Sequence, residues 1–122
     1  CKNQIKKGIN AFREAIDFIN KGVSIALMID QRVSEGEKIN FFGKPALTTT
    51  LPAQLAIKYN LKIVPVFIER DKKNDFRIKF LEEIDPLKFN DKFDLSKKLN
   101  NILEMMIKSN PNEWIWSHNR WK

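Results

Sequence analysis

The chain has 122 residues, of which 43% are hydrophobic and 30% charged, a composition typical of one globular domain and not of a disordered segment. Its 22 basic and 15 acidic side chains give a net charge of +7, which favours anionic partners such as nucleic acid, phosphate groups or an anionic bilayer. The single cysteine excludes an internal disulfide, and no apolar run reaches the roughly 18–20 residues that cross a bilayer.

The first two predicted elements are an amphipathic helix and a buried strand. Apolar residues recur at helical spacing over residues 3–21, and Gly22 supplies the stop signal. The residues that form this stripe are Ile5, Ile9, Phe12, Ile16 and Ile19. The run "VSIALMI", residues 23–29, is apolar on both faces, which predicts a strand with other elements packed on either side.

A loop over residues 30–47 is expected next, followed by a helix over 51–59 with Thr50 as its N-cap. The β-rich run 62–70 predicts a second strand, in which Pro65 indicates a bulge or an edge position. The polar residues 71–75 predict a hairpin turn into a third strand over 76–81. Asp94 is the expected cap of a last helix that runs to residue 108. Its core-facing positions are Leu95, Leu99, Ile102, Leu103 and Met106.

This order of elements predicts an α/β fold with a mixed sheet flanked by helices and a right-handed first crossover. Residues 1–122 are expected to form a single partial domain.

The loop 30–47 is the first candidate site, because it leaves the carboxyl end of a predicted strand and enters a helix N-terminus. The helix start favours an anion, and the hydroxyls of Thr48 and Thr49 add hydrogen-bond donors. Phe41 and Phe42, next to Gly43, are candidates for an apolar slot beside that polar end. The loop therefore predicts a site for an amphiphile, and the alternative is that both phenylalanines pack in the core.

Four charged or polar residues complete the candidate set. Asp30, Gln31 and Arg32 follow the predicted strand directly, and Arg70 lies just past the second one. Either they contact substrate or they hold the loop and the surface in place. Glu104 on the last helix is expected to be an ion-pair partner and not a catalyst.

His118 is the only histidine and lies near three tryptophans. No serine or cysteine with a carboxylate partner is arranged around it in sequence, so packing is the favoured interpretation over catalysis. Trp114, Trp116 and Trp121 are candidates for stacking on bases, for a bilayer interface, or for covering the open side of the fold. One histidine and one cysteine at opposite ends of the chain predict no metal site, and no glycine-rich nucleotide motif predicts a cofactor.

Three blocks in order carry a resemblance to a known family. They read "LMIDQRVSEGEKINFFGKPALTTTLPAQLAIKY", "IVPVFIER" and "LNNILEMMIKSNPNEWIWSHNRWK". Together they resemble the C-terminal half of the bacterial lipid A biosynthesis acyltransferases, the late lauroyl or myristoyl enzymes of the lysophospholipid-acyltransferase-like superfamily.

The resemblance implies the C-terminal half of a glycerolipid-acyltransferase-like fold. It also implies transfer of a fatty acyl group from acyl carrier protein or acyl-CoA to a hydroxyl of a lipid A precursor, at the cytoplasmic face of the inner membrane. Nucleic acid is not an implied partner. The family's catalytic motif, His-x-x-x-x-Asp/Glu, has no match here, because His118 lies four residues before the end. We therefore expect an inactive fragment that shapes the substrate site and leaves apolar surface exposed, with the catalytic half missing.

Two alternatives remain open at this point. One is a basic module that binds nucleic acid or an anionic membrane without catalysis, and its affinity would fall steeply with salt. The other is a self-contained interaction domain without a ligand.

Overall fold

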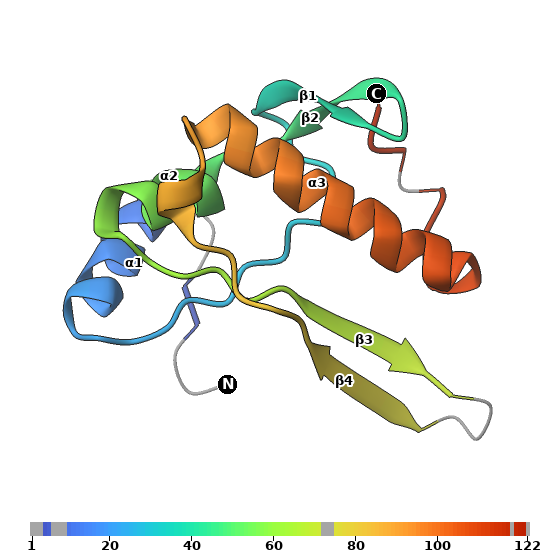
Figure 1. Ribbon diagram of the computed structural model, residues 1–122, viewed down its shortest axis with the longest axis horizontal. Helices are drawn as coiled ribbons and strands as arrows, with labels where there is room; N and C mark the ends of the chain where they lie inside the picture. Colours follow the sequence, from blue (N-terminus) through green and yellow to red (C-terminus); the bar gives the residue numbers. More distant parts are fainter. Residues whose placement is uncertain (1–3, 6–9, 72–74, 118, 122) are drawn as a thin grey trace.

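The computed structural model describes residues 4–5, 10–71, 75–117 and 119–121 (Figure 1). These residues form three helices, two β-hairpins and two short 3-10 turns. The helices are α1 (Ala11–Asn20), α2 (Leu51–Tyr59) and α3 (Lys92–Ser109), and the 3-10 turns are Pro86–Lys88 and Pro111–Glu113. The strands are β1 (Glu37–Phe41), β2 (Lys44–Thr48), β3 (Val66–Arg70) and β4 (Phe76–Phe80). The combination of helices and sheets confirms the α/β class.

Each sheet is a two-stranded antiparallel hairpin, β1 with β2 and β3 with β4. The described strands thus form two small sheets where the sequence predicted one mixed sheet with a parallel crossover. The hairpin over residues 66–80 was predicted. The strand β3 begins at Val66, directly after Pro65. Before Pro65, an isolated antiparallel bridge joins Ile63 to Ile84.

The predicted buried strand at residues 23–29 is wrong. This segment is an irregular stretch whose apolar side chains are largely exposed, including Val23 at 41% and Met28 at 76%. A strand needs a paired strand for its N–H and C=O groups, and no described strand pairs with this segment.

The predicted loop 30–47 contains β1 and most of β2. The hairpin turns at Phe42 and Gly43, whose φ angles are 51° and 76°. Two consecutive positive φ angles are typical of the two-residue turn whose twist matches an antiparallel hairpin. Asparagine or glycine usually occupies the first turn position, so the phenylalanine there hid the hairpin in the sequence.

α2 spans its predicted range, and α3 extends beyond its predicted range by two residues at its start and one at its end. α1 ends at Asn20, close to its predicted end, but it begins at Ala11 with Asn10 as the N-cap residue, and residues 4–5 are not helical, so the predicted start at residue 3 is wrong. Residues 6–9 of the predicted range lie outside the described part of the chain. Thr50 occupies the N-cap position of α2, but its hydroxyl accepts a hydrogen bond from the Gln54 side chain and caps no backbone N–H.

The cap of α3 is Asp91, and the prediction of Asp94 is wrong. The Asp91 carboxylate accepts hydrogen bonds from the backbone N–H groups of Phe93 and Asp94, both at 2.8 Å. Asp94 lies in the first turn, where its carboxylate contacts the backbone N–H of Asn90 at 3.4 Å. The N-cap thus lies three residues before its predicted position. The sequence did not distinguish the two positions, because aspartate is a favoured N-cap residue at either one.

α3 contributes to two buried clusters. The first lies between α2 and α3 and consists of Ala53, Ala56, Ile84, Leu95, Leu99 and Ile102. The second lies between α3 and the β1–β2 hairpin and consists of Phe41, Ala46, Leu103 and Ile107. Figure 1 shows the segment after α3 turning back towards the β1–β2 hairpin, while the β3–β4 hairpin extends away from α1 and α2.

Candidate functional site

The candidate residues fall in three places: the β1–β2 hairpin with its buried cluster, the irregular segment at residues 30–32, and an open pocket beside β3. Phe41 belongs to the buried cluster and is 0% exposed. Its ring stacks on Trp121 at 5.6 Å between centroids and meets Phe42 edge-on at 4.8 Å. Trp121 also donates from Nε1 to the Phe41 carbonyl at 3.1 Å. The structure thus places Phe41 in the core, and a role in lining a substrate slot stays a prediction.

Phe42 is half-buried at the tip of the same hairpin. Its backbone N–H donates to Oε1 of Glu104 at 2.6 Å, which fixes the turn to α3. Glu104 also pairs with Lys108 at 3.9 Å, as its predicted role as an ion-pair partner requires. Gly43 follows Phe42 and is exposed.

The threonines lie at the other end of the hairpin. Thr48 pairs with Glu37 at the end of β2 away from the turn, so the length of β2, about 14 Å at 3.4 Å per residue, separates it from Phe42. The hydroxyl of Thr49 accepts from the backbone N–H of Leu51 at 3.3 Å. One cleft lined by both Phe42 and the threonine run is therefore not what the structure shows.

Thr48 belongs to a buried polar network that the sequence analysis missed. Its hydroxyl accepts from Nδ2 of Asn100 at 3.1 Å and donates to the Ala46 carbonyl at 3.1 Å. Nη2 of Arg120 donates to Oδ1 of Asn100 at 3.0 Å, and the guanidinium lies 4.2 Å from the centroid of the Phe41 ring. The sequence did hold a signal for Asn100: it is a polar residue at a core-facing position of α3, beside Leu99, and a buried polar side chain needs a hydrogen-bond partner.

Asp30, Gln31 and Arg32 lie on the irregular segment that leads to β1. Asp30 is half-buried, whereas the other two are exposed. Burial lowers the pKa of Arg120, and the negative charge of Asp30 raises it in opposition. Asp30 is therefore electrostatically coupled to the buried network, while Gln31 and Arg32 face the surface.

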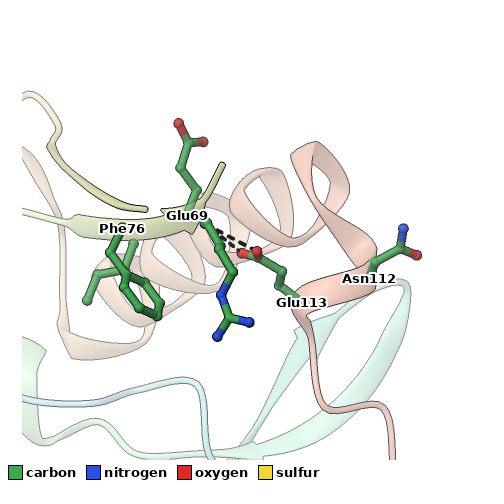
Figure 2. A pocket seen from close by; sticks show the side chains of 6 residues that line it. Glu69, Phe76, Asn112 and Glu113 are labelled. Atoms are coloured by element: carbon green, nitrogen blue, oxygen red, sulfur yellow. Dashed lines mark hydrogen bonds between the residues drawn. The ribbon is translucent and has the colours of Figure 1, made fainter. Parts of the chain in front are cut away.

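The open pocket lies where β3 meets the turn after α3 (Figure 2). It has a volume of about 370 Å³, and its lining residues are Ile68, Glu69, Arg70, Phe76, Asn112 and Glu113. The Glu113 carboxylate accepts from the backbone N–H of Arg70 at 3.2 and 3.3 Å. The Arg70 guanidinium lies 4.9 Å from the centroid of the Phe76 ring. Arg70 thus lines an open pocket, and its role as a site residue stays a prediction.

The pocket continues into an exposed apolar face of the β3–β4 hairpin. Side chains alternate across a strand, so this face carries Arg70 together with apolar residues that are 46–74% exposed. They are Val66, Ile68, Phe76, Ile78 and Phe80. On the opposite face Glu69 pairs with Lys79 at 2.8 Å and with Arg77 at 3.7 Å. Figure 2 shows Glu69 directed away from Phe76. One cation at the end of an apolar strip matches the chemistry of an anionic amphiphile.

The tryptophans contribute to packing. Trp114 and Trp121 are half-buried against Phe41, whereas Trp116 is exposed and donates from Nε1 to the Pro111 carbonyl at 2.9 Å. The prediction for His118 falls outside the described residues. In the described ranges no group of three His, Cys, Asp or Glu side chains is arranged to hold a metal. The same part of the chain has no helix of the length and hydropathy needed to span a bilayer.

Comparison with known proteins identifies the family. No curated protein sequence matched the chain at the significance threshold. The family model of the bacterial lipid A biosynthesis acyltransferases matches residues 2–122, nearly the whole sequence. The chain therefore belongs to the bacterial lipid A biosynthesis acyltransferase family.

Proposed function

We propose that the protein transfers a fatty acyl chain from acyl carrier protein or acyl-CoA to a hydroxyl of a lipid A precursor, in the synthesis of lipopolysaccharide. Family membership supports acyl transfer to lipid A in general. In this proposal residues 1–122 shape the substrate site and supply no catalytic base. No metal or cofactor takes part, and nucleic acid is not a partner.

The open pocket at Arg70 carries the proposal. An acyl donor and a lipid A precursor share two chemical features, an apolar chain and phosphate groups. Arginine binds phosphate through paired N–H donors. In the part of the chain that the structure describes, no carboxylate forms an ion pair with the Arg70 guanidinium, because Glu113 binds the Arg70 backbone instead. The guanidinium therefore retains its donors for a ligand, next to an apolar face.

We place the catalytic His-x-x-x-x-Asp/Glu motif upstream, in a larger acyltransferase domain of which these residues are the C-terminal portion. The segment 23–29 supports this arrangement, since most of its apolar side chains are exposed and no strand pairs with it among the described residues. The uncovered apolar face of the β3–β4 hairpin supports it as well. Large contiguous apolar patches are uncommon on isolated soluble domains.

We place the reaction at the cytoplasmic face of the inner membrane. Enzymes of lipid A synthesis are membrane-associated, and a net charge of +7 suits the anionic surface of that leaflet.

A matched pair of arginines tests the role of the pocket. Arg70 and Arg77 are both exposed and lie near the turn of the same hairpin, in adjacent cross-strand pairs, but Arg77 lies on the ion-paired face. In the complete protein, Arg70→Gln should raise the KM for the phosphorylated substrate at least about tenfold, the size of one charge-assisted hydrogen bond. Arg77→Gln should change KM less than about twofold. Equal effects of the two substitutions would show that the pocket does not bind substrate.

A further inference from the structure

Two exposed apolar side chains lie together in the segment that follows α3. Ile115 is 70% exposed and Trp116 is 52% exposed, and neither belongs to the two buried clusters. Nε1 of Trp116 donates to the Pro111 carbonyl at 2.9 Å, so the only polar atom of this side chain is already hydrogen-bonded within the segment. The fold therefore presents the apolar surface of an indole ring to the outside.

The turn of the β1–β2 hairpin adds a third apolar side chain. The Phe42 ring lies 6.2 Å from the Trp116 ring between centroids, and Phe42 is half-buried. Its φ angle of 51° is in the left-handed region, where glycine and asparagine form the same turn with less strain. Strained residues persist mainly at functional sites, so a phenylalanine in this position indicates a use for its side chain.

Two lysines flank the apolar side chains. Nζ of Lys108 lies 5.5 Å from the centroid of the Phe42 ring, and the Lys108 side chain is 66% exposed. Lys44 begins β2 directly after the turn and is exposed as well. The Glu104 carboxylate beside them is largely buried and accepts from the Phe42 backbone, so the exposed charge at the turn is positive. We name these five side chains the turn surface; they are Phe42, Lys44, Lys108, Ile115 and Trp116.

We propose that the turn surface rests on an anionic lipid bilayer and docks this end of the molecule on the membrane. Tryptophan is enriched at the boundary between headgroups and acyl chains, and lysine near that boundary binds anionic headgroups. An acidic protein would be matched mainly by the lysines, whereas the exposed apolar side chains match the boundary of a bilayer. The choice of lipid as the partner rests on the proposed function, which places the reaction at a membrane.

The turn surface lies close to the open pocket at Arg70. Glu113, whose carboxylate accepts from the Arg70 backbone, precedes Trp116 by three residues, so the Cα atoms of Glu113 and Trp116 are at most about 11 Å apart. A bilayer against Trp116 therefore lies near the pocket, which gives a lipid substrate a short path from the membrane to Arg70. The docking itself does not depend on acyl transfer.

Quenching of Trp116 fluorescence by lipids with brominated acyl chains tests the contact. The complete protein that contains this chain is bound to vesicles of phosphatidylcholine with about one quarter anionic phosphatidylglycerol. The emission that is lost in Trp116→Phe is that of Trp116, and brominated lipid should remove most of it. Persistence of this emission in vesicle-bound protein would overturn the proposal.

Leu87→Trp, made in the Trp116→Phe protein, is the matched control. Leu87 is 72% exposed and precedes the N-terminus of α3, whereas the turn surface lies at its C-terminal end. Brominated lipid should leave the emission of the introduced tryptophan unchanged. Equal quenching at the two positions would show that the chain has no preferred lipid-facing surface and would also overturn the proposal.

Two further measurements test the charges and the occupant. Replacing phosphatidylglycerol by phosphatidylcholine should reduce the quenching of Trp116, and Lys44→Gln together with Lys108→Gln should reduce it in the anionic vesicles. No effect of either change would contradict an anionic bilayer as the partner. Without vesicles, acrylamide in solution should quench Trp116, and protection there would show that another part of the complete protein covers the turn surface, which would overturn the proposal. No acyl donor is present, so these outcomes are independent of the acyl-transfer assay.

Discussion

Replacing Phe41 by alanine tests whether this residue belongs to the core of the fold. The side chain is fully buried, and deleting a buried phenylalanine side chain typically costs about 3–5 kcal/mol. Three aromatic rings, those of Phe42, Trp114 and Trp121, and the Arg120 guanidinium also contact the Phe41 ring. Such contacts each add about 0.5–1.5 kcal/mol, which puts the expected loss in unfolding free energy near the upper end, about 4–5 kcal/mol.

Urea unfolding followed by tryptophan fluorescence is the suitable assay, because Trp114 and Trp121 pack against Phe41 and report its environment. Phe76→Ala is the matched control: it deletes the same atoms at a position that is 66% exposed, and should cost less than about 0.5 kcal/mol. If Phe41→Ala leaves too little folded protein to measure, Phe41→Leu should still lose roughly 1–2 kcal/mol. Equal losses for the alanine variants at both positions would refute the assignment of Phe41 to the core.

Three further predictions concern the cap of α3, an exposed carboxylate and the apolar face. Asp91→Ala should lower the unfolding free energy by about 1 kcal/mol, and Asp94→Ala clearly less; equal losses in urea titrations would restore Asp94 as the cap. The hydrogen bond from Lys62 holds the pKa of Asp85 below its ordinary value of 3.8, so its stabilising contribution is present above that pH and is lost as pH falls through the lowered folded value. The stability difference between Asp85→Asn and the unsubstituted chain should therefore shrink in acid, and a pH-independent difference would contradict this reasoning. We expect residues 1–122 alone to self-associate through the exposed face of the β3–β4 hairpin, so Phe80→Ser should raise the monomer fraction in sedimentation, whereas an unchanged fraction would exclude that face.

Local signals in the sequence predicted the elements that depend mainly on neighbouring residues. Helical spacing of Leu95, Leu99 and Ile102 predicted α3 and its buried side. The alternating run that ends in Phe80, with a polar turn before it, predicted the β3–β4 hairpin. These features need no partner distant in sequence.

Two of the predictions that failed depended on partners distant in sequence or on an unusual turn residue. The run at residues 23–29 has the composition of a buried strand, but a strand forms only where another strand pairs with it. The β1–β2 hairpin was hidden because Phe42 takes a backbone conformation that phenylalanine rarely adopts.

The candidate site was predictable only in part for the same physical reason. Arg70 was a candidate because of its place at the end of a strand, where site residues are common, and it lines an open pocket; its role in binding stays a prediction. The network of Thr48, Asn100 and Arg120 was missed because its members lie 52 and 20 positions apart, and a buried arginine has no local signature. Tertiary packing brings them together.

Mass spectrometry of lipid A tests the central claim most directly. Cells that lack their own late acyltransferase activity would express either the complete protein that contains this chain or residues 1–122 alone. We predict that the complete protein adds one fatty acyl chain to the lipid A precursor, that Arg70→Gln impairs this addition, and that residues 1–122 add none. An unchanged lipid A in cells with well-expressed complete protein, or acylation by residues 1–122 alone, would contradict the account.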